Sequence, residues 1–340
     1  MSRSEFIFAF KAWRQELPKG GRCCVLISAD PDALASAMAF KRLIRSRVDF
    51  VDIRRVNEVT RPDNLSMIRY LRIPVKQWER HRRDEFNMFA LIDSQPSHNA
   101  QFQEQIYSAI IDHHPRTDLS GYLAPGAFCD INPGIGATSS MMTQFLQALK
   151  IRPGPLLATA LLYGIRTDTG AFERSGGEED LRAYQWLSRC ADANLLRRIS
   201  RSEYMRAWLP FFSRAFRSLQ DCHAGGAYAS LNEIRSADLI VSVADFFTKV
   251  HGLRWIAVSG IKSGTIIVVF RGDGSRDMGR FAEACFGDIG TAGGHRNMAR
   301  AEFSIDKVPE GIKPAEFVYK RLMTRKLRDA VSMSETGERQ

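Results

Sequence analysis

Short, uninterrupted apolar runs that alternate with helix-like segments are the feature that most constrains the fold of this chain. Cys23 to Ser28 and Met88 to Ile92 are such runs, and Ala33 to Ser46 between them has apolar residues at helical spacing. Strands that are apolar along their length are typical of a sheet covered on both faces by helices. Further strands are expected at 51–54 and 108–111, and helices at 138–149 and 156–165. The first two-thirds of the chain therefore predict a parallel α/β sheet.

A different pattern begins after about Ala215. Strand-like segments at 227–231, 255–261, 265–271 and 301–305 surround helix-like segments at 237–250 and 278–286, which predicts a smaller α+β domain. We expect a parallel-sheet domain over 1–185, a helical connector over 186–216, an α+β domain over 217–328 and a disordered tail over 329–340.

The composition is that of a soluble globular protein, with 44% hydrophobic and 25% charged residues among 340. No apolar run approaches the ~20 residues that span a bilayer, and Lys11, Arg14 and Glu16 interrupt or follow the first apolar stretch, which argues against a signal peptide. We expect a cytoplasmic protein with no membrane partner. The net charge of +10 fits an anionic partner such as nucleic acid or nucleotides, but a basic surface that serves only solubility fits as well.

Acidic residues and histidines follow several of the predicted strands. They are Asp30 and Asp32 after the first run, Asp93 after the second, Asp112, His113 and His114 after Ser108 to Ile111, and Asp168 at the end of a helical run. Ligands of parallel α/β sheets bind beyond the carboxyl ends of the strands. Carboxylates gathered there repel one another unless a cation neutralises them, and an oxygen-rich set with imidazoles suits Mn²⁺, or Mg²⁺ less well. Each motif also has an ordinary explanation, such as Asp30 capping a helix, but together they favour a metal site.

These motifs resemble those of the DHH phosphoesterases. The resemblance rests on D-P-D-A from Asp30, the Asp after the next apolar strand, IIDHHP, LLYGIRTDTGAF and the glycine-rich TAGGHRNMA from Thr291, which is similar to the Gly-Gly-His motif of the DHH-associated domain. It covers the chain from about Cys23 to Ile305. The nearest members are nano-RNases and related phosphatases or cyclic dinucleotide phosphodiesterases, whose active site lies in the cleft between the two domains.

The resemblance implies a role for each matching residue. Asp30 would bind a first metal ion and Asp32 a second, Asp93 would bridge the two, and His113 and Asp168 would complete the second site. His114 would face the scissile phosphate while Asp112 orients the imidazoles. The expected cofactor is Mn²⁺, as two ions, with Mg²⁺ as the alternative.

One position departs from the family pattern. A histidine that ligates the first metal normally precedes the D-x-D motif, and Val25 to Ala29 contains none, with Ser28 at best a weak ligand. The first metal would then bind weakly, take another ligand such as His98, or be missing.

The second domain is expected to hold the substrate. Gly293 and Gly294 leave room for backbone N–H groups to approach a phosphate, and His295 and Arg296 can donate to its oxygens. The resemblance places Arg271 at the same cleft. Thr138 and Ser139, at a predicted helix N-terminus, would hold a phosphate or simply cap the helix.

The function implied by these motifs is Mn²⁺-dependent hydrolysis of short oligoribonucleotides or linear dinucleotides to mononucleotides, with cyclic dinucleotides or adenosine 3′,5′-bisphosphate as related substrates. The alternative is a nucleotide-binding sensor whose catalysis is impaired by the absent histidine. A third reading is a pyrophosphatase or polyphosphatase. A homodimer is compatible with the family but is not required by the sequence.

Overall fold

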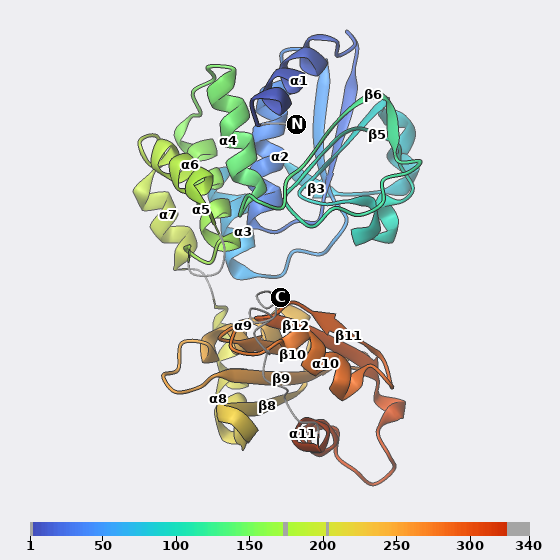
Figure 1. Cartoon of the computed structure of the whole chain (residues 1–340), viewed down its shortest axis with the longest axis vertical. Coiled ribbons are helices and arrows are strands. Elements are labelled where there is room, and N and C mark those ends of the chain that lie inside the picture. The colour runs from blue at the N-terminus through green and yellow to red at the C-terminus, as the bar shows by residue number, and fades with distance from the viewer. Residues whose placement is uncertain (1–2, 173–175, 202–203, 325–340) are drawn as a thin grey trace, which may run out of the picture. The chain divides into compact units, whose positions relative to one another are not determined.

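The computed structural model describes residues 3–172, 176–201 and 204–324 and divides the chain into two compact units, Met1–Glu203 and Tyr204–Gln340 (Figure 1). The division falls inside the segment 186–216, whose helices belong to the unit on either side of it. The expected tail, 329–340, lies outside the described residues. Within the described ranges, no helix has both the length and the apolar character needed to cross a membrane.

The first unit is built on six parallel strands in the order β3-β2-β1-β4-β5-β6. Their bounds are β1 Arg22–Ile27, β2 Phe50–Arg55, β3 Val75–Gln77, β4 Met88–Ile92, β5 Tyr107–Asp112 and β6 Leu123–Ile131. This confirms the parallel α/β prediction. β3 and β6 were not predicted, because β3 has three residues and β6 is an edge strand interrupted by Pro125 and Gly126, both of which are exposed.

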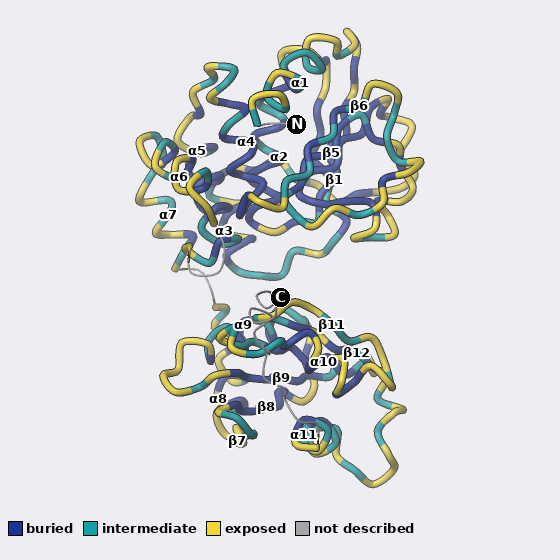
Figure 2. The backbone as a smooth tube through the Cα atoms, viewed as in Figure 1, coloured by how far each residue is buried: buried dark blue, intermediate teal, exposed yellow. Residues whose placement is uncertain are grey.

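Helices cover one face of this sheet. They are α1 Arg3–Gln15, α2 Pro31–Ile44, α3 Pro62–Leu71, α4 Thr138–Ala148, α5 Pro155–Asp168, α6 Glu178–Ser188 and α7 Ala193–Ser200. Side chains such as Phe40, Phe145 and Leu161 are fully buried between helices and sheet. The opposite face packs a separate apolar cluster, to which the short 3₁₀ helix η3 Ala100–Phe102 contributes Phe102. Figure 2 shows the strands of the sheet as the most buried part of the unit.

The second unit contains a six-stranded mixed sheet in the order β11-β12-β10-β9-β8-β7. The strands are β7 Gln220–Cys222, β8 Gly226–Glu233, β9 Trp255–Lys262, β10 Thr265–Gly272, β11 Thr291–Gly294 and β12 Met298–Ser304, and only the β8–β9 pair is parallel. α8 Leu209–Ser218 and α9 Ala237–Phe247 cover one face, and α10 Met278–Phe286 and α11 Pro314–Thr324 cover the other. Alternate residues of β10 serve the two faces, Ile267 on one and Val268 on the other. The α+β prediction is confirmed.

Candidate metal centre

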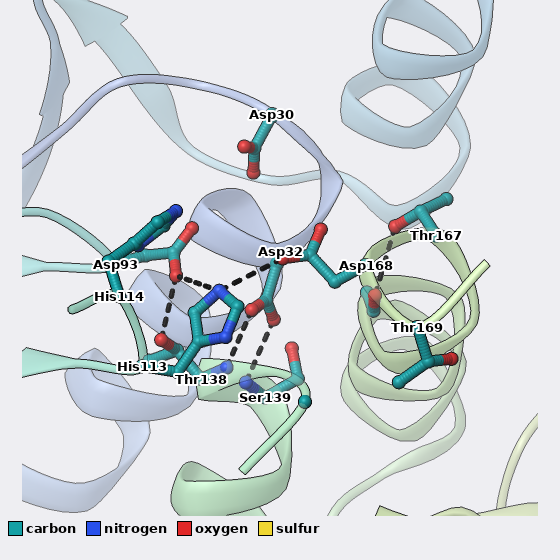
Figure 3. A network of polar contacts seen from close by, with 12 residues as sticks. Asp30, Asp32, Asp93, His113, His114, Thr138, Ser139, Thr167, Asp168 and Thr169 are labelled. Carbon is teal, nitrogen blue, oxygen red and sulfur yellow. Dashed lines mark hydrogen bonds and ion pairs between the residues drawn. The ribbon is translucent and has the colours of Figure 1, made fainter. Parts of the chain in front are cut away.

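Three adjacent strands of the first sheet bring the predicted acidic residues to one edge. β1, β4 and β5 are neighbours and parallel, so their carboxyl ends coincide. Asp32 lies in the first turn of α2 after β1, Asp93 follows β4, and Asp112 ends β5. Asp168, the last residue of α5, reaches the same place from the helical layer (Figure 3). The cluster therefore depends on strand order.

The carboxylate of Asp32 is fully buried and is held by the N-terminus of α4. It accepts hydrogen bonds from the backbone N–H groups of Thr138 at 2.6 Å and Ser139 at 2.8 Å. Burial, followed by the negative charge of Asp168, raises the pKa of Asp32 to about 6. Thr138 and Ser139, expected to contact phosphate, are themselves fully buried, and their N–H groups are used by Asp32 instead.

A glycine lets α5 come close enough to complete this arrangement. A Cβ atom at Gly164 would lie 2.5 Å from Ser139 Oγ and 3.0 Å from Asp32 Oδ1. Any larger residue would force Ser139, Asp32 or the helix itself to shift. The packing of the three helices therefore depends on the absence of a side chain at this position.

Asp93 is held in a left-handed backbone conformation, with φ of +60°. That conformation costs roughly 1–2 kcal/mol for a residue with a Cβ atom, and it is secured by a hydrogen bond from the Asp93 N–H to the Ile111 carbonyl at 2.8 Å. The Thr138 hydroxyl donates to Asp93 Oδ1 at 2.7 Å. Burial, followed by the charge of Asp32, raises the pKa of Asp93 well above its ordinary value.

His113 places an imidazole nitrogen among these carboxylates. Its Nε2 lies 3.1 Å from Asp168 Oδ2 and 3.7 Å from Asp93 Oδ1, while its Nδ1 lies 3.3 Å from the Ile135 carbonyl. Donation from Nδ1 to that carbonyl leaves the Nε2 lone pair facing negative oxygens. Nε2 is buried, and the carboxylates of Asp168 and Asp93 are the groups that it faces. Metal-ligating histidines are commonly oriented in this way, by a carbonyl on the other ring nitrogen.

The residues fit a hard divalent cation. Asp32, His113 and Asp168 each offer a ligand atom, and these atoms lie within 4.8 Å of one another, as do those of Asp93, His113 and His114. Without a cation, burial would lower the pKa of His113, but contacts with Asp168 and Asp32 raise it to about 9. In the absence of a cation, His113 would therefore carry a proton on Nε2, at the position where a cation fits between the carboxylates. Carboxylate oxygens with one or two imidazoles favour Mn²⁺ or Mg²⁺ over zinc.

Asp30 does not join either group. It is the N-cap of α2, accepts a hydrogen bond from the Ala33 N–H at 2.9 Å and is exposed, and Figure 3 shows its side chain apart from the others. The structure thus brings together four of the predicted metal ligands, namely Asp32, Asp93, His113 and Asp168, and leaves Asp30 outside the two groups.

Asp112 and His114 form a hydrogen-bonded pair beside the cluster. Asp112 Oδ1 accepts from His114 Nδ1 at 2.7 Å, and Gln95 Nε2 donates to Oδ2 at 2.6 Å. Burial alone would raise the pKa of Asp112, but the hydrogen bond and charge of His114 outweigh it and lower the pKa. The side chain of His114 is 41% exposed, so it remains accessible to a ligand.

His98, the candidate replacement for the absent histidine, lies on the other side of this pair. Its Nδ1 accepts a hydrogen bond from the Gln95 N–H at 3.2 Å, and its ring centroid is 5.3 Å from that of His114. Its ligand atoms group with those of Asp112 and His114, not with Asp30. His98 therefore does not replace the missing ligand beside Asp30.

The predicted substrate residues of the second unit gather at one end of its sheet. Arg271 on β10 is paired in register with Met298, which follows the turn containing His295 and Arg296. Arg271 donates to Asp245 Oδ1 at 2.7 Å, and Arg296 donates to the Gly274 carbonyl at 2.6 Å.

The two glycines at this turn differ in what they require. Gly294 has φ of +150°, and a Cβ atom there would lie 2.5 Å from the Met298 carbonyl oxygen. The space around Gly293 is open, with no atom within 4 Å of an added Cβ. Gly294 is therefore needed for the fold of the turn, whereas Gly293 leaves its backbone accessible.

Two supporting residues were not foreseen. Gln95, two residues after Asp93, holds Asp112 and accepts from the Thr117 N–H at 2.7 Å. The fully buried Asp180 accepts from the N–H of Gly136 at 2.9 Å and from the Ser140 hydroxyl at 2.5 Å, which fixes the start of α4. The position of Gln95 next to a motif was a usable signal, but nothing in the sequence marks Asp180.

Comparison with known proteins supports the fold. No family model matches the chain. An uncharacterized protein of Methanocaldococcus jannaschii is 33% identical over 287 residues, which are 84% of this chain but only 57% of that relative, so this chain spans little more than half of its length. The crystal structure of an exopolyphosphatase-related protein from Bacteroides fragilis is similar with a TM-score of 0.75 and 16% identity, over 94% of this chain and 96% of that one. A pGpG-specific phosphodiesterase of Vibrio cholerae is similar over 89% of this chain and 98% of its own, with a TM-score of 0.43 and 12% identity.

Proposed function

We propose that this chain, which has the fold of the DHH phosphoesterases, is a metal-dependent phosphoesterase. The single observation that carries the proposal is the gathering of carboxylates around the buried imidazole of His113, whose Nε2 lies 3.1 Å from Asp168 Oδ2 and 3.7 Å from Asp93 Oδ1. A lone pair and carboxylates in such proximity are stable only around a cation or a proton. Asp32, Asp93, His113 and Asp168 would hold the metal.

Divalent ions in such a centre lower the pKa of a bound water and neutralise phosphate oxygens. The residues around them have separate tasks. His114, whose Nδ1 donates to Asp112, would present its other nitrogen to the phosphate as a hydrogen-bond donor. Burial lowers the pKa of His114, but the hydrogen bond and charge of Asp112 outweigh it and raise the pKa, which favours the donating form.

The proposed substrates are short oligoribonucleotides and linear dinucleotides, cleaved to mononucleotides with Mn²⁺ as the metal. Cyclic dinucleotides and adenosine 3′,5′-bisphosphate belong to the same chemical class. Arg271, Gly293, His295 and Arg296 would bind the nucleotide part, because they offer guanidinium, imidazole and backbone N–H donors at one end of a sheet. The basic composition of the chain agrees with an anionic substrate.

The test is a product-resolved assay on RNAs of two to five nucleotides, cyclic dinucleotides and adenosine bisphosphate, with and without Mn²⁺. We expect Mn²⁺-stimulated release of mononucleotides. Asp93→Ala should abolish turnover because Asp93, which lies between Thr138 and His113, is one of the carboxylates that would hold the metal. Asp118→Ala, an exposed carboxylate of the same unit, should leave it unchanged. Near-normal turnover by Asp93→Ala would refute the proposal.

A second candidate function is a nucleotide-binding sensor without efficient catalysis. Ser28 stands where the family has a histidine, and Asp30 lies outside the ligand groups, so a first metal site would lack ligands. Retained dinucleotide binding with no Mn²⁺-stimulated hydrolysis would favour this function. Faster release of phosphate from pyrophosphate than from a diribonucleotide would favour the pyrophosphatase reading.

A further inference from the structure

An open hollow of about 370 Å³ lies in the first unit, at the C-terminal ends of α4 and α6. That volume is within the range of roughly 300–1,000 Å³ typical of small-molecule sites. Its lining includes three cations and an apolar wall, formed by Lys150, Arg152, Arg189, Ile151, Trp186 and Cys190. Among the described residues, no acidic side chain lines it.

The three cations of the hollow have no counter-charge. In the described parts of the chain, none of Lys150, Arg152 and Arg189 has a side-chain hydrogen bond or ion pair, whereas Arg182 on the same helix as Trp186 pairs with Glu178. Two of the carbonyl groups at these helix ends already accept hydrogen bonds from the backbone. The Gln147 carbonyl accepts from Lys150 N–H and the Leu187 carbonyl from Cys190 N–H, both at 2.9 Å. In the described residues, the side chains of the three cations are therefore available to an anion.

The apolar wall of the hollow offers an aromatic surface. Trp186 is half-buried, and its ring contacts no other aromatic ring among the described residues. Ile151 lies beside it. A flat ring can stack on an indole while its anionic group reaches the cations. We propose that this hollow binds a nucleoside monophosphate, whose base would lie against Trp186 and whose phosphate would contact Arg152, Arg189 and Lys150.

This site is separate from the metal centre. The N–H groups of Thr138 and Ser139 at the start of α4 hold Asp32, whereas the hollow begins at Leu146. Leu146 and Gln147 lie eight and nine residues after Thr138 on α4, which at a rise of 1.5 Å per residue separates the two places by about 12–14 Å. The proposal does not depend on the phosphoesterase activity.

The experiment follows the alkylation of Cys190 by iodoacetamide, with and without AMP, in the EDTA-treated 340-residue chain, by peptide mass spectrometry. Cys129 and Cys222, also half-buried, are internal controls. We expect AMP to slow the alkylation of Cys190 alone. Adenosine or inorganic phosphate should need an at least about tenfold higher concentration for the same protection, because each lacks one half of the contacts.

Variants assign the effect to the hollow. Arg152→Gln/Arg189→Gln should weaken protection by about tenfold or more, because the double variant removes two charged donors from the phosphate. Arg182→Gln, which removes a charge from the same helix outside the hollow, should behave as the unmodified chain. If AMP at concentrations up to about 10 mM gave no protection, the dissociation constant would be too high for a specific site, and the proposal would be overturned. Equal protection by inorganic phosphate, or unchanged protection in the double variant, would also overturn it.

Discussion

Replacing Asp32 by Asn should change how the stability of the metal-free protein depends on pH. The folded state raises the pKa of Asp32 to about 6 from an ordinary value of 3.8. A raised pKa means that the folded state binds a proton that the unfolded state releases, so Asp32 costs stability as the pH rises from about 4 to about 6. The difference between these two pKa values corresponds to about 3 kcal/mol.

The amide introduced by Asp32→Asn carries no charge at any pH, so the difference in unfolding free energy between the two proteins reports this titration together with the changes that it causes at Asp93 and His113. The amide cannot accept from both Thr138 and Ser139, because its nitrogen would face one of their N–H groups. That mismatch costs about 1–3 kcal/mol at every pH and cancels in the comparison. Relative to the unmodified chain, Asp32→Asn should therefore gain about 3 kcal/mol between pH ~4 and pH ~7.

The assay is urea unfolding of EDTA-treated protein at several pH values, followed by circular dichroism. Asp118→Asn is the matched control, because hydrogen bonds from Ser120 lower the pKa of Asp118 and give its titration the opposite sign. Saturating Mn²⁺ should stabilise the unmodified chain more than Asp32→Asn. The explanation would be refuted if the difference in unfolding free energy between Asp32→Asn and the unmodified chain stayed constant with pH. It would also be refuted if the unmodified chain became relatively more stable as the pH rises.

Three further predictions concern other positions. Thr138→Val removes the hydroxyl that donates to Asp93 at 2.7 Å, and we expect about tenfold weaker Mn²⁺ binding by titration calorimetry with little change in unfolding temperature. Gly164→Ala places a Cβ atom 2.5 Å from Ser139 Oγ, which should lower the free energy of unfolding, measured with urea, by about 1–3 kcal/mol. An unchanged urea midpoint would show that the neighbouring groups can move aside without cost. Arg271→Ala should weaken dinucleotide binding without altering Mn²⁺ affinity, and loss of metal with unchanged dinucleotide affinity would contradict its assignment.

Much of the fold follows from local sequence. The apolar runs of β1, β4 and β5 can be satisfied only inside a covered sheet, and β4 occupies the predicted residues. The missed strands, such as β3 and β11, were short or at sheet edges, where few side chains are buried and the pattern is weak. The helices α1, α3 and α11 were not predicted either.

For the candidate site, the sequence by itself determined which side chains arrive at the sheet edge. Asp32, Asp93, His113 and Asp168 follow strands or end a helix, and parallel strands share their carboxyl edge. Their metal-binding roles, like those of the residues in the second unit, remain predictions.

Only the tertiary structure decided how the site is held. The sequence predicts that Thr138 and Ser139 hold a phosphate or cap the helix, yet they support Asp32 because α4 begins against α2, more than a hundred residues away in the chain. Asp180 and Gly164 support the same helix terminus from α6 and α5. Local patterns encode burial and element type, but hydrogen bonds and close approaches between distant segments exist only after the helices have packed. The sequence thus selected the chemical groups, and packing set their distances, their burial and their pKa values.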